Sequence, residues 1–327
     1  MAIMNKKGVF FTFMAILVVG VLVLAFSSDI YVTSKNEVPV VKSRVKTADS
    51  YLRNLEGSYL KRSLYTSSYN ALNSLILYIE KEGFLDSETD LNAKFKEVVL
   101  SGSINGKNIN EEYGINLMEE KTFIYRLDKI EEMSQDVLHI TTNFSKENID
   151  TVIFQSDDTG SWQVGVNLTM NFSVDAGIAS WNKTETISIM LSIIGFDDPL
   201  YLPYNHPIKE TLFNDTEWNV SNLIEHIENA TYRHESNESK HHSPSYLMRF
   251  YESYSPSLCC GIESMINQTL CNGVTDKSYV DYCFWSDECD DYGAKLYNVT
   301  YITTPSYPFK LDAYHIAQYN VTKEAYI

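Results

Sequence analysis

The sequence predicts an α+β fold, in which an N-terminal helical region precedes an antiparallel sheet. Three patterns support this prediction. Residues 9–26 form an uncharged apolar run, and apolar side chains then recur at alternating steps of three and four between residues 41 and 79. Residues 162–174 instead alternate strictly between apolar and polar, which is the period of a strand with one buried face. Helices followed by antiparallel strands belong to the α+β class.

The apolar run predicts a transmembrane helix. As a helix, residues 9–26 would be about 27 Å long, close to the thickness of the hydrocarbon core of a bilayer. Lys6 and Lys7 precede the run and the first charge after it is Asp29, so the positive-inside rule places everything beyond the helix outside the cell. A cleaved secretory signal ending near residues 25–27 is the alternative, but such signals have apolar regions of roughly 7–15 residues.

The next region, residues 27–136, is predicted to be a helical stalk. Its first helix begins after Asn36, carries Pro39 in its first turn and ends near Gly83, a length of about 45 residues. The first part of the apolar stripe consists of Val41, Val45, Ala48, Leu52, Leu55 and Tyr59. The spacing then slips out of phase near Lys61 and Arg62, and the stripe resumes with Tyr65, Tyr69, Leu72, Ile76 and Ile79. Such a stripe is expected to pack against a domain or a neighbouring subunit.

Two shorter helices are expected at residues 87–100 and 119–135, with a small hairpin turn at residues 104–107. Residues 137–200 are predicted to form an antiparallel meander that packs on the helices, with the alternating segment 162–174 as its clearest strand.

The last part, residues 201–327, is predicted to be largely irregular and to carry the cysteines. A short helix is expected at about residues 220–230, and extended segments are expected at about 294–303 and 309–320.

Asparagines of the motif Asn-x-Ser/Thr are concentrated in the chain from residue 143 onward, and no asparagine before that position begins one. Composition would supply roughly two or three such motifs by chance. Because these motifs accept N-linked glycans in exported proteins, they support an extracytoplasmic location. The eleven predicted acceptors are Asn143, Asn167, Asn171, Asn182, Asn214, Asn219, Asn229, Asn237, Asn267, Asn298 and Asn320.

The five cysteines (Cys259, Cys260, Cys271, Cys283 and Cys289) lie close together. In an exported protein this clustering predicts a local disulfide framework. A zinc site is the alternative, but no Cys-x2-Cys pair is present. We expect a Cys283–Cys289 bond and a bond from Cys259 or Cys260 to Cys271, because joining the adjacent Cys259 and Cys260 would strain their peptide. The odd cysteine would be free or would join subunits.

The sequence predicts no enzyme, no catalytic residue and no cofactor, because it contains no nucleophile elbow, phosphate-binding loop, dinucleotide fingerprint or zinc-protease motif. Histidines between residues 234 and 242 resemble a metal cluster, but a polar loop is the favoured interpretation. The carboxylates of Asp287, Asp290 and Asp291 are weak Ca²⁺ candidates, for which a solvated acidic turn is favoured.

Charge excludes one class of partner. The chain has 26 basic and 43 acidic residues, a formal net charge of −17. Such a surface repels phosphate backbones, so we expect no nucleic-acid binding.

The N-terminus resembles a known signal. Lys6-Lys7-Gly8 followed directly by Val9-Phe10-Phe11 is similar to the prepilin (class III) signal of type IV pilin-like proteins. The resemblance implies that a prepilin-type peptidase cuts between Gly8 and Val9, so that residues 1–8 are a leader. It further implies that residues 9–26 anchor the chain in the lipid bilayer and allow self-association. Pilins usually carry Glu where this chain has Phe13, so anchoring is implied more directly than polymerisation.

Three later segments are also similar to exported archaeal pilin-like proteins: residues 198–201, 260–264 and 277–282. We therefore expect a single-pass membrane protein whose N-glycosylated ectodomain has a pilin-like structural or adhesive role at the cell surface. A receptor or solute-binding ectodomain remains the alternative, and an extracellular hydrolase is a less favoured one.

Overall fold

The computed structural model describes residues 16–18, 38–204, 210–214, 216–234, 243–267, 276–286, 295–303 and 308–325. The chain divides into two units between Lys46 and Thr47, and the sheets belong to the second. Most of the predicted transmembrane helix lies outside the described residues. Among the helices that are described, none combines the length and the apolar character needed to cross a membrane.

The long helix is present. Helix α2 (Val38–Asn54) continues through a π-helical turn η1 (Leu55–Tyr59) into α3 (Leu60–Glu82) without a break. Gly83 ends it with φ +90°, a conformation that favours glycine. The predicted end of this helix is therefore confirmed, and its predicted start after Asn36 lies outside the described residues.

The π-helical turn explains the slip in the apolar stripe. It inserts an extra residue into the helix and so rotates the following side chains by about 100°. After the turn the buried face carries Leu60, Leu64 and Leu75, whereas Tyr65 and Tyr69 are 46% and 43% exposed. The assignment of these two tyrosines to the buried stripe was wrong.

The two shorter helices are α4 (Glu88–Ser101) and α6 (Phe123–Leu138). The Ser87 hydroxyl caps α4 by accepting a hydrogen bond from the N–H of Asp90, and Thr122 caps α6 in the same way. The predicted start of α6 at residue 119 was therefore three to four residues too early.

Between α4 and α6 lie the small hairpin of β1 (Ser103–Ile104) and β2 (Lys107–Asn108), helix α5 (Ile109–Tyr113) and the 3₁₀ turn η2 (Asn116–Met118).

The main sheet is antiparallel, with β5 (Gln163–Asp175) at its centre. Strand β6 (Ser180–Ser192) pairs with the full length of one edge of β5. On the other edge β3 (Thr141–Phe144) pairs with one end of β5 and β4 (Asp150–Phe154) with the other. The antiparallel sheet is confirmed, but the chain does not form a simple meander, because β3 and β4 both pair with β5 rather than with each other; η3 (Lys146–Asn148) joins them.

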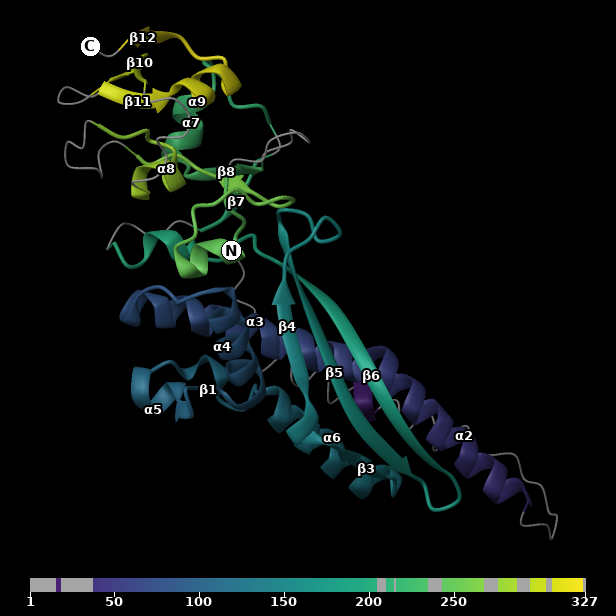
Figure 1. The fold of residues 1–327 in the computed structure, drawn as a ribbon. Coiled ribbons are helices and arrows are strands. Elements are labelled where there is room, and N and C mark those ends of the chain that lie inside the picture. Colours follow the sequence, from purple (N-terminus) through teal and green to yellow (C-terminus); the bar gives the residue numbers. More distant parts are fainter. Residues whose placement is uncertain are drawn as a thin grey trace. The chain divides into compact units, whose positions relative to one another are not determined.

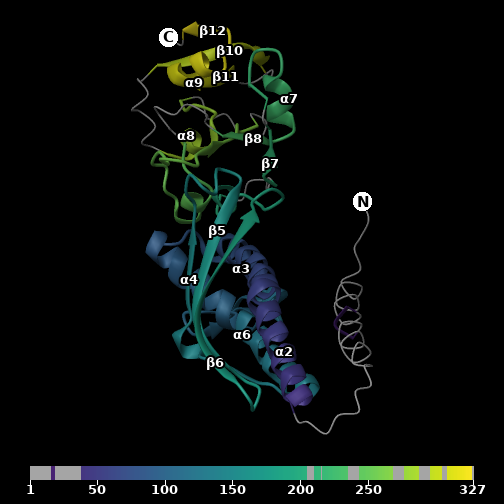
Figure 2. The ribbon, with the colours of Figure 1, turned by 90° about the vertical axis from the view of Figure 1, so that its right-hand side faces the viewer.

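One face of this sheet forms the core. The predicted alternation is confirmed, since Val164, Val166, Leu168, Met170, Phe172 and Val174 are all at most 3% exposed. Helix α3 packs along β6, α4 along β4 and α6 along β3 (Figures 1 and 2). The opposite face of the sheet carries mainly polar side chains, together with the exposed Val152 and Met190.

The C-terminal part is more regular than predicted. In one small sheet, β8 (Thr231–His234) pairs in parallel with β7 (Leu212–Phe213) and antiparallel with β9 (Ile262–Glu263). In another, β10 (Leu296–Thr303) lies between β11 (Pro308–Asp312) and β12 (Lys323–Ala325).

Short helical elements connect these strands: η4 (Pro199–Tyr201), α7 (Leu223–Glu228), η5 (Leu247–Tyr251), α8 (Asp281–Trp285) and α9 (Ala313–Gln318). The predicted extension of residues 309–320 is correct only for β11. Asp312 ends the strand and starts α9, because its side chain accepts the N–H of His315.

Candidate functional site

A buried ion network is centred on Arg249 of η5. The guanidinium is fully buried, and its Nη1 donates hydrogen bonds to Asp198 Oδ2 at 2.7 Å and Asp281 Oδ2 at 2.8 Å. Its Nη2 donates to the backbone carbonyl of Ile262, and the Tyr232 hydroxyl donates to Asp198. One cation thus holds together segments that are far apart in the sequence.

The sequence positions both carboxylates by local turns. Asp198 accepts the N–H of Leu200 at the start of η4, and Asp281 accepts the N–H of Tyr282 at the start of α8. Burial opposes the charge on Arg249, but the two carboxylates outweigh it and raise its pKa above the usual range. Burial raises the pKa of Asp281, and Arg249 partly offsets that effect. The guanidinium therefore faces a carboxylate from each of these two turns.

A second buried network surrounds His315 of α9. Its Nδ1 lies 2.6 Å from Asp312 Oδ2, and its Nε2 lies 3.3 Å from Glu263 Oε2. The Tyr319 hydroxyl donates to Glu263 and the Ser278 hydroxyl to Asp312. Burial lowers the pKa of His315, but the two carboxylates outweigh burial and raise it to about 10. The ring is therefore an imidazolium whose two N–H groups both face carboxylates.

These two networks use the three segments that the sequence analysis singled out. Asp198, Glu263, Ser278 and Asp281 come from residues 198–201, 260–264 and 277–282. Strand β9 joins the networks, because Ile262 accepts from Arg249 while Glu263 faces His315. Fully buried ionic groups that satisfy one another act by fixing the arrangement of the segments around them.

Sequence reasoning missed the two cations at the centres of these networks. Arg249 stands alone in the apolar stretch Tyr246-Leu247-Met248-Arg249-Phe250-Tyr251. A cation in such a stretch requires a buried anionic partner. This pattern alone could have indicated a buried ion pair at Arg249.

One group of side chains has the composition of a metal site. Ligand atoms of Cys283, Asp312 and His315 lie within 4.8 Å of one another. However, Cys283 is disulfide-bonded, so its sulfur is not a thiolate, and both ring nitrogens of His315 already face carboxylates. These residues therefore do not fit a metal ion.

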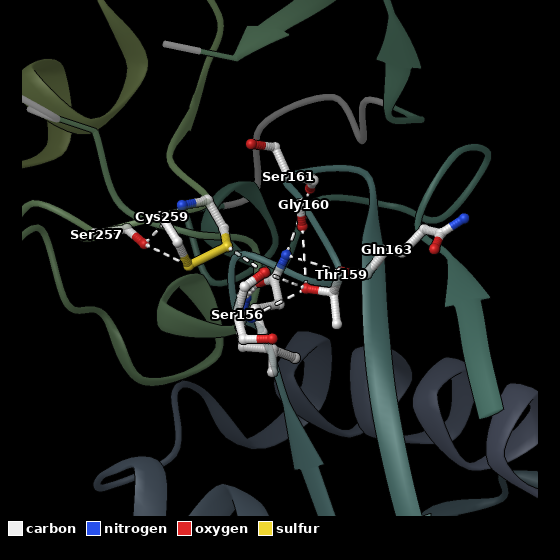
Figure 3. The surroundings of a disulfide bond; sticks show 10 residues. Ser156, Thr159, Gly160, Ser161, Gln163, Ser257 and Cys259 are labelled. Atoms are coloured by element: carbon white, nitrogen blue, oxygen red, sulfur yellow. Dashed lines mark hydrogen bonds between the residues drawn. A yellow bond between two sulfur atoms is a disulfide. The ribbon is translucent and has the colours of Figure 1, made fainter. Parts of the chain in front are cut away.

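One disulfide differs from the prediction (Figure 3). Cys259 and Cys260 are bonded to each other, with 3.7 Å between their Cα atoms. The expectation that this pair would avoid a mutual bond was wrong. The Cys260 sulfur lies 3.2 Å from the carbonyl oxygen of Ser156, in the turn between β4 and β5. The bonded pair thus contacts the end of the main sheet.

Cys283 is also disulfide-bonded, and its partner lies outside the described residues. The bond to Cys289 therefore stays a prediction. Other predicted positions also lie outside the described part of the chain: Gly8, Val9, Asn237, Cys271, Cys289, Asp287, Asp290 and Asp291.

Ten of the eleven predicted glycosylation asparagines are described. Five are exposed (Asn143, Asn171, Asn182, Asn229 and Asn320), and five are half-buried (Asn167, Asn214, Asn219, Asn267 and Asn298). Asn219 and Asn320 line the same open, polar hollow, together with Glu217, Trp218 and Gln318. A sugar on either asparagine would cover this hollow.

Comparison of the chain with models of known families, with curated proteins and with solved structures found no match.

Proposed function

We propose that this protein is a membrane-anchored, N-glycosylated extracellular protein with a pilin-like structural or adhesive role. The observation that carries the proposal is the junction of Lys6-Lys7-Gly8 with the uncharged residues 9–26. A prepilin-type peptidase would cut after Gly8, and the apolar helix would remain as the anchor in the lipid bilayer. Self-association would proceed through this same helix.

The described fold agrees with this role. A long helix, α2 to α3, follows the proposed anchor and leads into a domain with an antiparallel sheet. Half of the described glycosylation motifs have an exposed asparagine, which an attached sugar can reach. The disulfide-bonded cysteines fit an oxidising compartment outside the cytoplasm.

N-terminal sequencing of the protein isolated from cell membranes tests the proposal. We expect the mature chain to begin at Val9. Replacement of Gly8 by Val should block processing and leave Met1 in place, whereas the matched control Ala2→Val should be processed normally. An intact N-terminus in the unchanged protein would rule out cleavage by a prepilin-type peptidase. A new N-terminus near Ser27 would show in addition that residues 9–26 are not retained as an anchor.

A further inference from the structure

Four glycosylation motifs share the outer face of the main sheet. In a strand, residues two apart point to the same side, so an acceptor asparagine and its Ser or Thr lie on one face. On β5 this outer face carries Asn167, Thr169, Asn171 and Ser173, opposite the buried apolar residues. Asn182 of β6 and Asn143 of β3 both pair with Ser173. The four acceptors therefore belong to one surface.

The acceptors are close together. Asn143, Ser173 and Asn182 form one row across three strands. Because neighbouring strands are about 4.8 Å apart, the backbones of Asn143 and Asn182 are roughly 10 Å apart. Asn171 lies two residues along β5 from the middle of that row, or about 7 Å, and Asn167 lies four residues further. Sugars on these residues would cover adjacent parts of the same face.

Hydrogen bonds orient two of the acceptor amides. The Thr184 hydroxyl donates to Asn171 Oδ1 at 2.6 Å, and the Ser188 hydroxyl donates to Asn167 Oδ1 at 2.7 Å. The carbonyl oxygens are thus held against β6. In the described part of the chain, neither Nδ2 has a hydrogen-bond partner, and Nδ2 is the atom to which an N-linked sugar is joined.

Asn214 differs from these four, although it also begins a motif. Its Nδ2 lies 2.9 Å from Nδ1 and 3.1 Å from Nε2 of His226. His226 is only 9% exposed and stacks on the buried Trp218, with ring centroids 5.2 Å apart. The Oδ1 of Asn214 accepts from both the N–H and the hydroxyl of Thr216. A sugar on Nδ2 would have to displace the imidazole from its stack.

We propose that glycans on Asn143, Asn167, Asn171 and Asn182 form one cover over the outer face of the β3–β6 sheet, and that Asn214 stays unmodified. This inference rests on the proposed function, because it requires export to a compartment with a glycan donor. The covered face would then point toward solvent in any assembly of the protein.

The donor is a glycan joined through phosphate to a lipid carrier. In each transfer the bond between the anomeric carbon and the phosphate oxygen breaks, and the phosphate leaves with the bonding electrons. A bond forms between that carbon and Nδ2, which gives up one proton to solvent.

Mass spectrometry of the protein from membranes of its own cells tests the proposal. Glycopeptides should show sugar on the four sheet asparagines and none on Asn214. A variant with all four sheet asparagines replaced by Gln should lose the mass of four glycans. The matched control Thr216→Val removes the motif at Asn214 but keeps its amide, and it should lose no mass.

Circular dichroism checks that each variant is folded. If the fourfold variant does not fold, Ser145→Ala and Ser173→Ala remove two of the sheet motifs singly, and each should lose one glycan. Sugar on Asn214 as often as on Asn171 would overturn the proposal, as would bare sheet asparagines beside glycosylated motifs elsewhere. Absence of sugar from every motif would instead overturn the proposed glycoprotein itself.

Discussion

The imidazole of His315 donates from Nδ1 to Asp312 Oδ2 over 2.6 Å. The pair lies beside the second hydrophobic core, which includes Tyr279, Phe309 and Tyr319. The two residues are three apart, so the first turn of α9 places one directly against the other. Burial acts against both charges, but His315 nevertheless lowers the pKa of Asp312 well below its usual range. The pair therefore remains ionised over a wide range of pH.

The pH dependence of stability should reflect this pair. The pKa of His315 is about 10 in the folded protein and about 6.5 in an unfolded chain. Its contribution is therefore complete below pH 6.5 and is lost as the pH rises through 10. The contribution of Asp312 is present above its unfolded pKa of about 3.9 and is lost as the pH falls through its lowered folded pKa.

We therefore expect the free energy of unfolding to be highest between about pH 4 and 6.5, and then to fall by up to about 1.4 kcal/mol per pH unit. Urea unfolding at pH 5, 7 and 9 measures this slope. The His315→Gln variant should be less stable and should show a flatter slope. An unchanged slope in that variant would show that other groups cause it.

Removal of Arg249 should destabilise the protein strongly. Arg249→Met leaves Asp198 and Asp281 buried without their cation, which should cost about 3–5 kcal/mol. Lys96→Met is the matched control, because it breaks the Lys96–Asp150 pair, whose side chains are 41% and 71% exposed. That exposed pair should contribute less than about 1 kcal/mol. Equal losses in urea unfolding for the two variants would contradict the role given to Arg249.

The sequence predicted the elements that depend on short-range patterns. The helix ending at Gly83, the start of a helix near Ser87 and the alternation of residues 162–174 all follow from residue spacing. The first half of β6 was missed, because residues 180–186 are polar or only partly buried and show no alternation of apolar residues. Pairing across the hairpin with β5, rather than its own apolar pattern, makes this segment a strand.

The ion networks could not be predicted for a related reason. Arg249 meets Asp198 across 51 positions, and His315 meets Glu263 across 52. No local pattern states which of the 43 acidic residues becomes buried beside which cation. The bond between Cys259 and Cys260 could not be predicted from the sequence, because strain in the peptide between adjacent cysteines argues against it.

Gly165 should not tolerate a side chain. It pairs with Phe154 across β4 and β5, and a Cβ at Gly165 would lie 2.4 Å from the Cζ atom of the Phe154 ring. Gly165→Ala should therefore lower stability by about 1–3 kcal/mol. Gly57→Ala is the control, because a Cβ there meets nothing within 4 Å. In urea unfolding, the double variant with Gly165→Ala and Phe154→Ala should lose less free energy of unfolding than the two single variants lose in sum.

Disulfide mapping should separate the two bonds of the cysteine region. Digestion without reductant should give one peptide with Cys259 joined to Cys260 and a second species in which Cys283 is linked to Cys289. Because the second bond closes only a short loop, it should stabilise the folded protein by about 2–3 kcal/mol. The hydrophobic core should therefore stay folded when the bond is reduced. A Cys283–Cys271 linkage would disprove the predicted partner, and free thiols at all five positions would disprove the framework.

The N-terminal helix should be the element that holds the protein in the membrane. Asp at the centre of a membrane helix costs about 2.5–3.5 kcal/mol, so Val19→Asp combined with Val23→Asp should release the protein from membranes. Any filaments should disappear as well, because burial of the same apolar side chains, each contributing about 1.5–3 kcal/mol, would drive helix bundling.

Val19→Ile combined with Val23→Ile is the matched control and should leave the protein in the membrane fraction. Membrane fractionation and electron microscopy measure the two outcomes. Residues 30–327 expressed separately should stay folded and monomeric, because they retain both hydrophobic cores but lack the apolar run. Filaments formed by this shorter chain would show that assembly does not depend on the N-terminal helix, and the pilin-like mechanism would then be wrong.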